Sequence, residues 1–391
     1  MPKRACPRKI TVSIGLLARN EESRLPATLA TLFRQTLFRE LDQRGERAEI
    51  WCVANACTDD TAAVAARIFQ EQQASHPRAE AFLANAVSVT TPGKINAWNL
   101  FVHEISDHES GCLILMDADI RLAESTTLWH LVRGLRENAE AHVTVGEPLK
   151  DIALKSSPSL RERLSLATSR VTQSSSAQLT GQLYCIRGDI ARGIRLPRHL
   201  AACEDGFIKS LVCSDFLKRP SNPARILRVE GASHIFEAYT SASAILRNQK
   251  RQMIGQTFVH VLVDHYLPPL CARNHTTPAE VVRQLDESDP DWLRDLIARH
   301  IRDARHFWRL FPHVCSFRFR RWRSLPAGAK LRHLPATLLG TAVTALAAWM
   351  AYRTLRRGVL GYWPQKPPQV GMPPRVRLPD GLDLAPPAPA G

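Results

Sequence analysis

The sequence lacks the features that mark several classes of protein. Its nine cysteines are an odd number with no pair at C-x-x-C spacing, which argues against a disulfide framework and a thiolate zinc site. We expect reduced, mostly buried thiols in a cytosolic compartment instead. The basic start, residues 1–9, leads into a strand-like run and not into the apolar segment and cleavage site of a secretory signal. There is no internal repeat, and no helix-turn-helix, zinc-finger or RNA-recognition signature, so nucleic acid is not an expected partner.

What the chain does have is positive charge. Its 391 residues include 52 Lys and Arg against 37 Asp and Glu, and the formal net charge is +15. This balance favours anionic partners such as phosphates, nucleotides or lipid headgroups. The apolar fraction of 45% is ordinary for a globular protein and is enough for a packed core.

Short apolar runs alternate with helical patterns over the first 150 residues. The runs predict strands at 10–18, 49–54, 86–91, 112–116 and 142–145, and the helical patterns predict helices at 26–38, 58–75, 94–106 and 126–138. This order predicts an α/β fold, a doubly wound and mostly parallel sheet with helices on both faces. Such sheets bind ligands at the carboxyl ends of their strands.

The C-terminal part differs in composition. Residues 278–323 are basic and aromatic, and residues 334–352 form a run of 19 residues without a charge, close to the ~20 needed to span a bilayer. Basic residues lie on both sides of this run. We therefore expect attachment to the cytoplasmic face of the cell membrane, either through a single C-terminal span or through an interfacial helix.

These changes in pattern suggest three parts. The first is a domain over residues 1–270, with halves at 1–150 and 151–270. A basic helical region, 271–362, follows it. The Pro-rich tail, 363–391, is expected to be disordered.

Polar clusters follow three of the predicted strands. They are Arg19-Asn20-Glu21-Glu22, the segment 55–60, and Asp117-Ala118-Asp119. Residues two apart in an extended segment point the same way, so Asp117 and Asp119 are expected to face one ligand. Two carboxylates on one edge suit Mg²⁺ or Mn²⁺, with water and substrate phosphates completing the coordination. Taken alone, the pair is also compatible with a solvated loop that happens to hold two acids.

In their order and spacing, these motifs resemble those of the family 2 glycosyltransferases, which have the GT-A fold. The matching segments are Ala18-Arg19-Asn20-Glu21-Glu22, Val53-Ala54-Asn55-Ala56-Cys57-Thr58-Asp59-Asp60-Thr61, Gly93-Lys94-Ile95-Asn96 and the Asp-x-Asp motif Asp117-Ala118-Asp119, and the resemblance covers roughly residues 9–260. Many members have Asp at the position of Ala54, where it contacts the nucleotide base. The departure predicts a donor other than a UDP-sugar, or a base contact made by another group.

The resemblance implies a set of site residues on the donor side. Asp117 and Asp119 are the expected metal ligands. Asn20 with Glu21 or Glu22 would border the base and ribose, and Lys94 is a candidate partner for the diphosphate, with a surface lysine opening a helix as the alternative. The full donor-binding set is Arg19, Asn20, Glu21, Glu22, Asn55, Lys94, Asp117 and Arg251.

On the acceptor side, Glu204-Asp205 resembles the acidic pair of the family in which one carboxylate is the catalytic base, and we choose Asp205. A helix start that favours acids through the helix dipole is the alternative, and both readings can hold at once. Gly181-Gln182 resembles an acceptor-side segment of the family, with an ordinary tight turn as the alternative. Arg251 belongs to a basic segment, 247–256, that partly matches a Gln/Arg-rich motif, and a solvated basic helix is its alternative.

The expected reaction is the inverting transfer of a sugar, by a single displacement, from a nucleotide-diphosphate donor to a hydroxyl of a saccharide or lipid-linked acceptor. It would use Mg²⁺ or Mn²⁺ and no organic cofactor, and polysaccharide biosynthesis is the expected setting. A nucleotidyltransferase of related α/β fold is the alternative. Such an enzyme needs a Gly-rich basic loop after its first strand, whereas this chain has Glu21 and Glu22 there.

Overall fold

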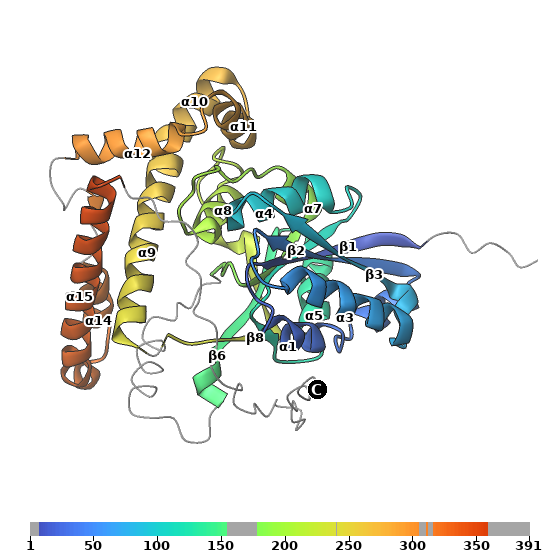
Figure 1. The fold of residues 1–391 in the computed structure, drawn as a ribbon. Coiled ribbons are helices and arrows are strands. Elements are labelled where there is room, and N and C mark those ends of the chain that lie inside the picture. The colour runs from blue at the N-terminus through green and yellow to red at the C-terminus, as the bar shows by residue number, and fades with distance from the viewer. Residues whose placement is uncertain (1–7, 155–177, 240, 305–309, 312–315, 359–391) are drawn as a thin grey trace, which may run out of the picture.

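A sheet of eight strands forms the centre of the protein, seen in a computed structural model that describes residues 8–154, 178–239, 241–304, 310–311 and 316–358 (Figure 1). The strand order is β3-β2-β1-β4-β7-β6-β8-β5. The strands are β1 (Lys9–Ala18), β2 (Glu46–Asn55), β3 (Phe82–Val89), β4 (Cys112–Asp117), β5 (Arg121–Leu122), β6 (Val143–Lys150), β7 (Leu183–Arg187) and β8 (Ile226–Phe236).

The half of the sheet formed by β3, β2, β1 and β4 is parallel, as predicted. β1 and β4 are buried along most of their length and consist largely of aliphatic residues, as parallel strands covered on both faces require. Leu17 of β1 pairs with Val53 of β2 on one side and with Asp117 of β4 on the other. The polar segments that follow these three strands therefore meet at one edge of the sheet.

The other half makes the sheet mixed, and this corrects the expectation of a mostly parallel one. β7 pairs antiparallel with β4 and β6, and β5 pairs antiparallel with β8, whereas β6 and β8 are parallel. Parallel neighbours require a crossover connection, usually a helix, so the alternation of strands and helices over residues 1–150 predicted that the strands there are parallel. No such alternation precedes β7, and its direction could not be predicted from the sequence.

Helices cover both faces of the sheet, as predicted. One face packs against α1 (Leu25–Leu32), α2 (Leu37–Gln43), α3 (Thr61–Ser75) and α5 (Thr127–Glu137). The other packs against α4 (Lys94–Leu100), the π-helical turn η2 (Phe101–Ile105), α7 (Gly188–Arg192), α8 (Glu204–Cys213) and α9 (Ala242–His260). Short 3-10 turns are η1 (Ala79–Ala81), η3 (Asp151–Leu154) and η4 (Pro223–Arg225).

Several element boundaries differ from those predicted, among them the following three. The single helix expected at 26–38 is two helices, because the chain turns between them and the Thr36 N–H donates to the Ser125 carbonyl at 2.8 Å. Helix α3 begins three residues later than expected, since the Thr58 N–H is taken by the Asn20 side chain. Strand β3 begins at Phe82, four residues before its predicted start.

The chain beyond α9 is helical in the part that is described. The elements are the π-helical turn η5 (Val261–Tyr266), α10 (Leu267–Asn274), α11 (Pro278–Ser288), α12 (Trp292–Asp303), α14 (Ser316–Arg323) and α15 (Ala327–Arg356). Helix α15 packs along α9, on the side away from the sheet (Figure 1). Its segment His333–Arg356 contains an 18-residue window with a mean hydropathy of 1.5, and by length and composition it could cross a membrane. The tail predicted at 363–391 lies outside the described residues, as do residues 155–177.

Candidate functional site

The motif after β1 ties two loops together at the carboxyl edge of the sheet. Asn20 has a left-handed backbone (φ 56°), and its side-chain oxygen accepts the Thr58 N–H at 2.8 Å. The Glu22 carboxylate accepts the Asp60 N–H at 3.2 Å. The Glu21 N–H donates to the hydroxyl of the first residue of α3 at 2.9 Å. These three residues fix the shape of this edge of the sheet. Any contact with a nucleotide-sugar donor would be a second role for them.

Asn55 holds the loop that leads into α4. Its side-chain oxygen accepts the Gly93 N–H at 2.6 Å, and its side-chain nitrogen donates to the Thr91 carbonyl at 2.9 Å. Gly93 has a φ of +138°, which L side chains rarely adopt, so this turn requires glycine. Asn55 is fully buried and fixes the turn that precedes Lys94, and its contact with a donor stays a prediction.

Lys94 connects three segments that are far apart in the sequence. Its ammonium lies 2.7 Å from Asp117 Oδ1 and 2.9 Å from Glu204 Oε1, and it donates to the Gly181 carbonyl at 3.0 Å. A Cβ at Gly181 would lie 2.9 Å from the Glu204 carboxylate, so glycine permits this close approach. Two carboxylates and one carbonyl thus surround the ammonium. Lys94 thus braces the two acids, and its contact with a donor diphosphate stays a prediction.

The two acids that share Lys94 have pKa values shifted in opposite directions. Burial raises the pKa of Asp117 to about 6. The charge of Lys94 opposes this increase, whereas the nearby charges of Asp119 and Glu204 add to it. Burial also acts on Glu204, but there the ammonium outweighs it and lowers the pKa of the carboxyl group. Burial alone would lower the pKa of Lys94, and the two carboxylates raise it instead. Lys94 is thus always charged. Its charge outweighs the effect of burial on the pKa of Glu204 but not on the pKa of Asp117.

The consecutive acids at the start of α8 have different surroundings. They follow Cys203, whose backbone is left-handed (φ 61°). Asp205 Oδ1 accepts the Gly206 N–H at 2.8 Å, and burial together with the charge of Glu204 raises the pKa of Asp205. A general base works best when its pKa lies near the working pH. Of the two, Asp205 is therefore the better base, and Glu204 is held as an ion by Lys94.

Arg19 brings unpaired hydrogen-bond donors to the same edge. Its Nε and Nη1 are buried and have no partner among the described residues. Buried donors without partners are rare and unfavourable, and phosphate oxygens are the partners that a guanidinium matches best. Arg251 of α9 is exposed. Its positive charge contributes to the low pKa of Glu204, so it lies on the same side of the molecule as the acids.

His234 lies beside the acceptor-side segment. It is fully buried on β8, and its Nε2 is 3.2 Å from Oε1 of Gln182. Burial lowers the pKa of His234 to about 4, so the ring is neutral at pH 7. The Gln182 carbonyl in turn accepts the Asp117 N–H at 2.8 Å. Neither this carbonyl nor that of Gly181 could be predicted to act as an acceptor here, because every residue carries a backbone carbonyl whatever its type.

The donor set at the edge fits a hard divalent cation. Within the described residues no group of three or more His, Cys, Asp or Glu side chains is arranged to hold a metal ion. The protein would therefore supply the two carboxylates of Asp117 and Asp119, and substrate phosphates and water would supply the other ligands. Mg²⁺ is commonly bound in this way, through one or two carboxylates and the substrate.

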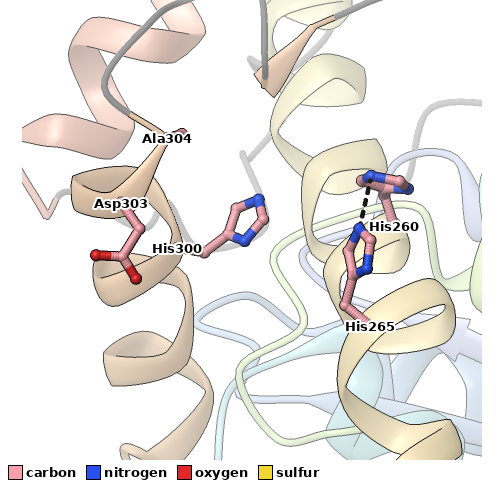
Figure 2. Close-up of a pocket in the computed structure, with 5 residues that line it drawn as sticks. All are labelled: His260, His265, His300, Asp303 and Ala304. Atoms are coloured by element: carbon pink, nitrogen blue, oxygen red, sulfur yellow. Dashed lines mark hydrogen bonds between the residues drawn. The ribbon is translucent and has the colours of Figure 1, made fainter.

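A separate cavity of about 230 Å³ lies among the C-terminal helices and is shown in Figure 2. It is lined by His260, His265, His300, Asp303 and Ala304. His260 and His265 face each other with their Nε2 atoms 3.3 Å apart (Figure 2). The cavity shares no residue with the acidic cluster, and none of its histidines was a candidate from the sequence.

Comparison by sequence finds no match to a protein family and no match to a curated protein. Comparison by structure finds a fragment of S. aureus TarS, 1–349, at 12% identity and a TM-score of 0.42, covering 89% of this chain and 92% of that one. A longer TarS structure has 13% identity and a TM-score of 0.41, and 55% of its length is covered, with 89% of this chain. A third is glucosyl-3-phosphoglycerate synthase from Mycobacterium tuberculosis in complex with Mn²⁺, UDP-glucose and phosphoglyceric acid. It has 15% identity and a TM-score of 0.39, with 62% of this chain and 78% of that one covered.

Proposed function

We propose that this protein is a metal-dependent glycosyltransferase of the GT-A type that resembles family 2. It would move a sugar from a nucleotide-diphosphate donor to an acceptor hydroxyl by an inverting single displacement. The proposal rests on the resemblance of the motifs in sequence and on their geometry.

One observation supports it more than any other. Lys94, Asp117 and Glu204 come from three separate motifs, and the fold joins them in one charged cluster, 2.7 and 2.9 Å from the ammonium to the two carboxylates. A solvated acidic loop and an unrelated helix start would not need a shared buried cation. The cluster gives the Asp-x-Asp pair and the α8 pair one common function.

The donor side would be formed by Arg19, Asp117 and Asp119. The unpaired donors of Arg19 are suited to the diphosphate oxygens. When bound between the two aspartates and the diphosphate, Mg²⁺ or Mn²⁺ would neutralise the charge that develops on the leaving group. Lys94 holds Asp117 and Glu204 at a fixed separation. Because Ala54 has no polar side-chain group, the base must be recognised by other groups or must differ from uracil.

The acceptor side would be formed by the start of α8. The proton of the attacking hydroxyl would pass to the Asp205 carboxylate, whose raised pKa makes it a stronger base than Glu204. Glu204, paired with Lys94, would remain ionised and fix the direction of the helix start. Arg251, on the neighbouring α9, would add positive charge near the diphosphate.

We also propose that the enzyme acts at the cytoplasmic face of the cell membrane, on a saccharide or lipid-linked acceptor, in polysaccharide biosynthesis. The support is the apolar segment His333–Arg356 of α15 and the basic residues on both sides of it.

A donor screen tests the reaction. The full chain is offered a panel of nucleotide sugars with Mn²⁺ or Mg²⁺, and the release of nucleoside diphosphate is measured with and without EDTA. We expect release from at least one donor, its loss in EDTA, and its loss in Asp117→Asn and Asp119→Asn. Asp264→Asn, at an exposed acid of η5, serves as the matched control and should be unaffected. Full turnover in excess EDTA contradicts the metal role.

A further inference from the structure

Exposed large apolar side chains gather on one helix. Of the seven in the described residues, five belong to α15: Leu331, Leu338, Leu339, Leu346 and Trp349, with 80, 51, 61, 47 and 48% exposure. Their spacing of three, seven and eight residues places all five on one face of the helix. Soluble proteins rarely leave so continuous an apolar stripe in water, so this face is expected to have a partner.

The opposite face of α15 is packed against the protein. Ala347, Ala348, Ala351 and Leu355 are 0–3% exposed, and they repeat at the three- and four-residue spacing of a helix. This small-residue face contacts α9 and α12, and Figure 1 shows α15 lying along α9. The helix therefore belongs to the fold on one side and presents its leucines and Trp349 on the other.

The charge around the stripe identifies the kind of partner. Residues 316–357 contain nine Lys and Arg, four in α14, two near the start of α15 and three near its end, and they contain no Asp or Glu. Arg320, Arg323, Arg353 and Arg356 are exposed, and the Arg353 guanidinium lies 4.9 Å from the Trp349 ring centroid. An apolar stripe between clusters of arginine, with Trp at its border, matches an anionic lipid surface.

We propose that the exposed face of α15, with the arginines at its two ends, is a docking surface for an anionic lipid bilayer, and that the helix lies in the plane of the interface without spanning it. This deepens the membrane attachment proposed above. A spanning orientation would separate α15 from α9 or draw the charged Arg247, Lys250 and Arg251 of α9 into the hydrocarbon, which is strongly unfavourable. An in-plane helix keeps its alanine face on α9 and buries only the leucine face.

This orientation also bears on the acceptor. On its other side α9 packs against the segment before α8, where a Cβ at Gly255 would lie 2.7 Å from the Ala202 backbone and the Cys203 sulfur. One helix thus contacts both the docking face and the segment that holds Glu204 and Asp205. Membrane binding would thus fix the height of the acceptor side above the bilayer, with α9 and α15 between them.

Vesicle flotation of the full chain tests the surface without any donor or acceptor. Vesicles of phosphatidylcholine alone are compared with vesicles that contain phosphatidylglycerol. We expect binding to the anionic vesicles, weakened about fivefold for each arginine in Arg353→Gln and Arg356→Gln, and about tenfold or more in the double variant Leu338→Ser, Leu339→Ser. The matched controls are Leu83→Ser on β3 and Arg67→Gln on α3, both exposed, which should bind as the wild type does.

The in-plane orientation is tested separately. Cell membranes that contain the full chain are washed with alkaline carbonate, which should release it. The emission of Trp349 is the part of the wild-type fluorescence that is lost in Trp349→Phe. Lipids brominated near the headgroup should quench this emission, and lipids brominated at the ends of the acyl chains should not. Retention after carbonate means a span and overturns the in-plane orientation. The docking surface is overturned if the leucine variant binds vesicles as well as the wild type does. It is also overturned if the wild type forms a dimer in the absence of lipid and the leucine variant does not. A failed donor screen with intact flotation would count against the enzyme proposal alone.

Discussion

Asp117→Asn should stabilise the metal-free protein while it removes activity. Burial and neighbouring acids raise the pKa of Asp117 from 3.8 to about 6. An acid whose pKa is higher in the folded state binds more protons when folded, so its ionisation lowers the free energy of unfolding as pH rises. The shift of roughly two units corresponds to about 3 kcal/mol, at 1.36 kcal/mol for each unit. Asn keeps the shape and a hydrogen-bond acceptor for Lys94 but cannot ionise.

The pH dependence follows from the same shift. The gain in stability should be small at pH 4, increase through pH 5 and 6, and level off at about 3 kcal/mol at pH 7 and above. The assay is urea unfolding of wild type and variant in EDTA across this range. Asp42→Asn is the control of opposite sign. There a hydrogen bond from Arg8 lowers the pKa of the carboxyl group, so the variant should be less stable than the wild type above about pH 4, and the difference should shrink as pH falls.

Metal provides a second readout. A ligand that binds only the folded state stabilises it by RT ln(1 + [L]/Kd), so Mn²⁺ should raise the stability of the wild type and leave Asp117→Asn nearly unchanged. If the variant is less stable than the wild type at pH 7 in EDTA, the carboxylate is not under electrostatic strain and the reasoning fails. If Mn²⁺ stabilises both proteins equally, the metal does not bind at Asp117.

Three further predictions concern the remaining site residues. Lys94→Met should lower stability by about 3–5 kcal/mol, since it leaves two acids without their shared cation. Lys94→Arg should not have the stability of the wild type, because a planar guanidinium does not match three acceptors around one atom. Thermal unfolding of the two variants measures both effects. Asp205→Asn should slow transfer by about 10²–10⁴-fold with donor affinity unchanged, and normal turnover in this variant with a dead Glu204→Gln would exchange their roles. Arg19→Met should leave the ligand-free fold as stable as the wild type, because the buried Nε and Nη1 donors that it removes have no partner. It should weaken nucleoside diphosphate binding tenfold or more. Calorimetric titration measures this affinity, and an unchanged affinity would show that Arg19 does not belong to the site.

The alternation of apolar runs and helical patterns was enough to predict the parallel half of the sheet. Strands β1, β2 and β4 were found because buried parallel strands are continuous aliphatic segments, and their common edge follows from their common direction. The mixed half was not predictable in the same way. Strand β5 has two residues, too few for any periodicity, and the directions of β6 and β7 depend on which strands they meet.

The chemistry of the candidate residues was in the sequence, but their mutual arrangement was not. Side-chain type alone made Asp117 and Asp119 candidate ligands and Glu204-Asp205 a candidate acidic pair. The role of Lys94, the orphaned donors of Arg19 and the difference between Glu204 and Asp205 depend on distances and burial between segments that lie about 20 to 110 residues apart. Composition likewise indicated an apolar segment near the C-terminus. The proposal that this helix lies on a membrane without crossing it rests on the packing of its alanine face on α9, because hydropathy adds up residues without regard to the side of the helix they occupy.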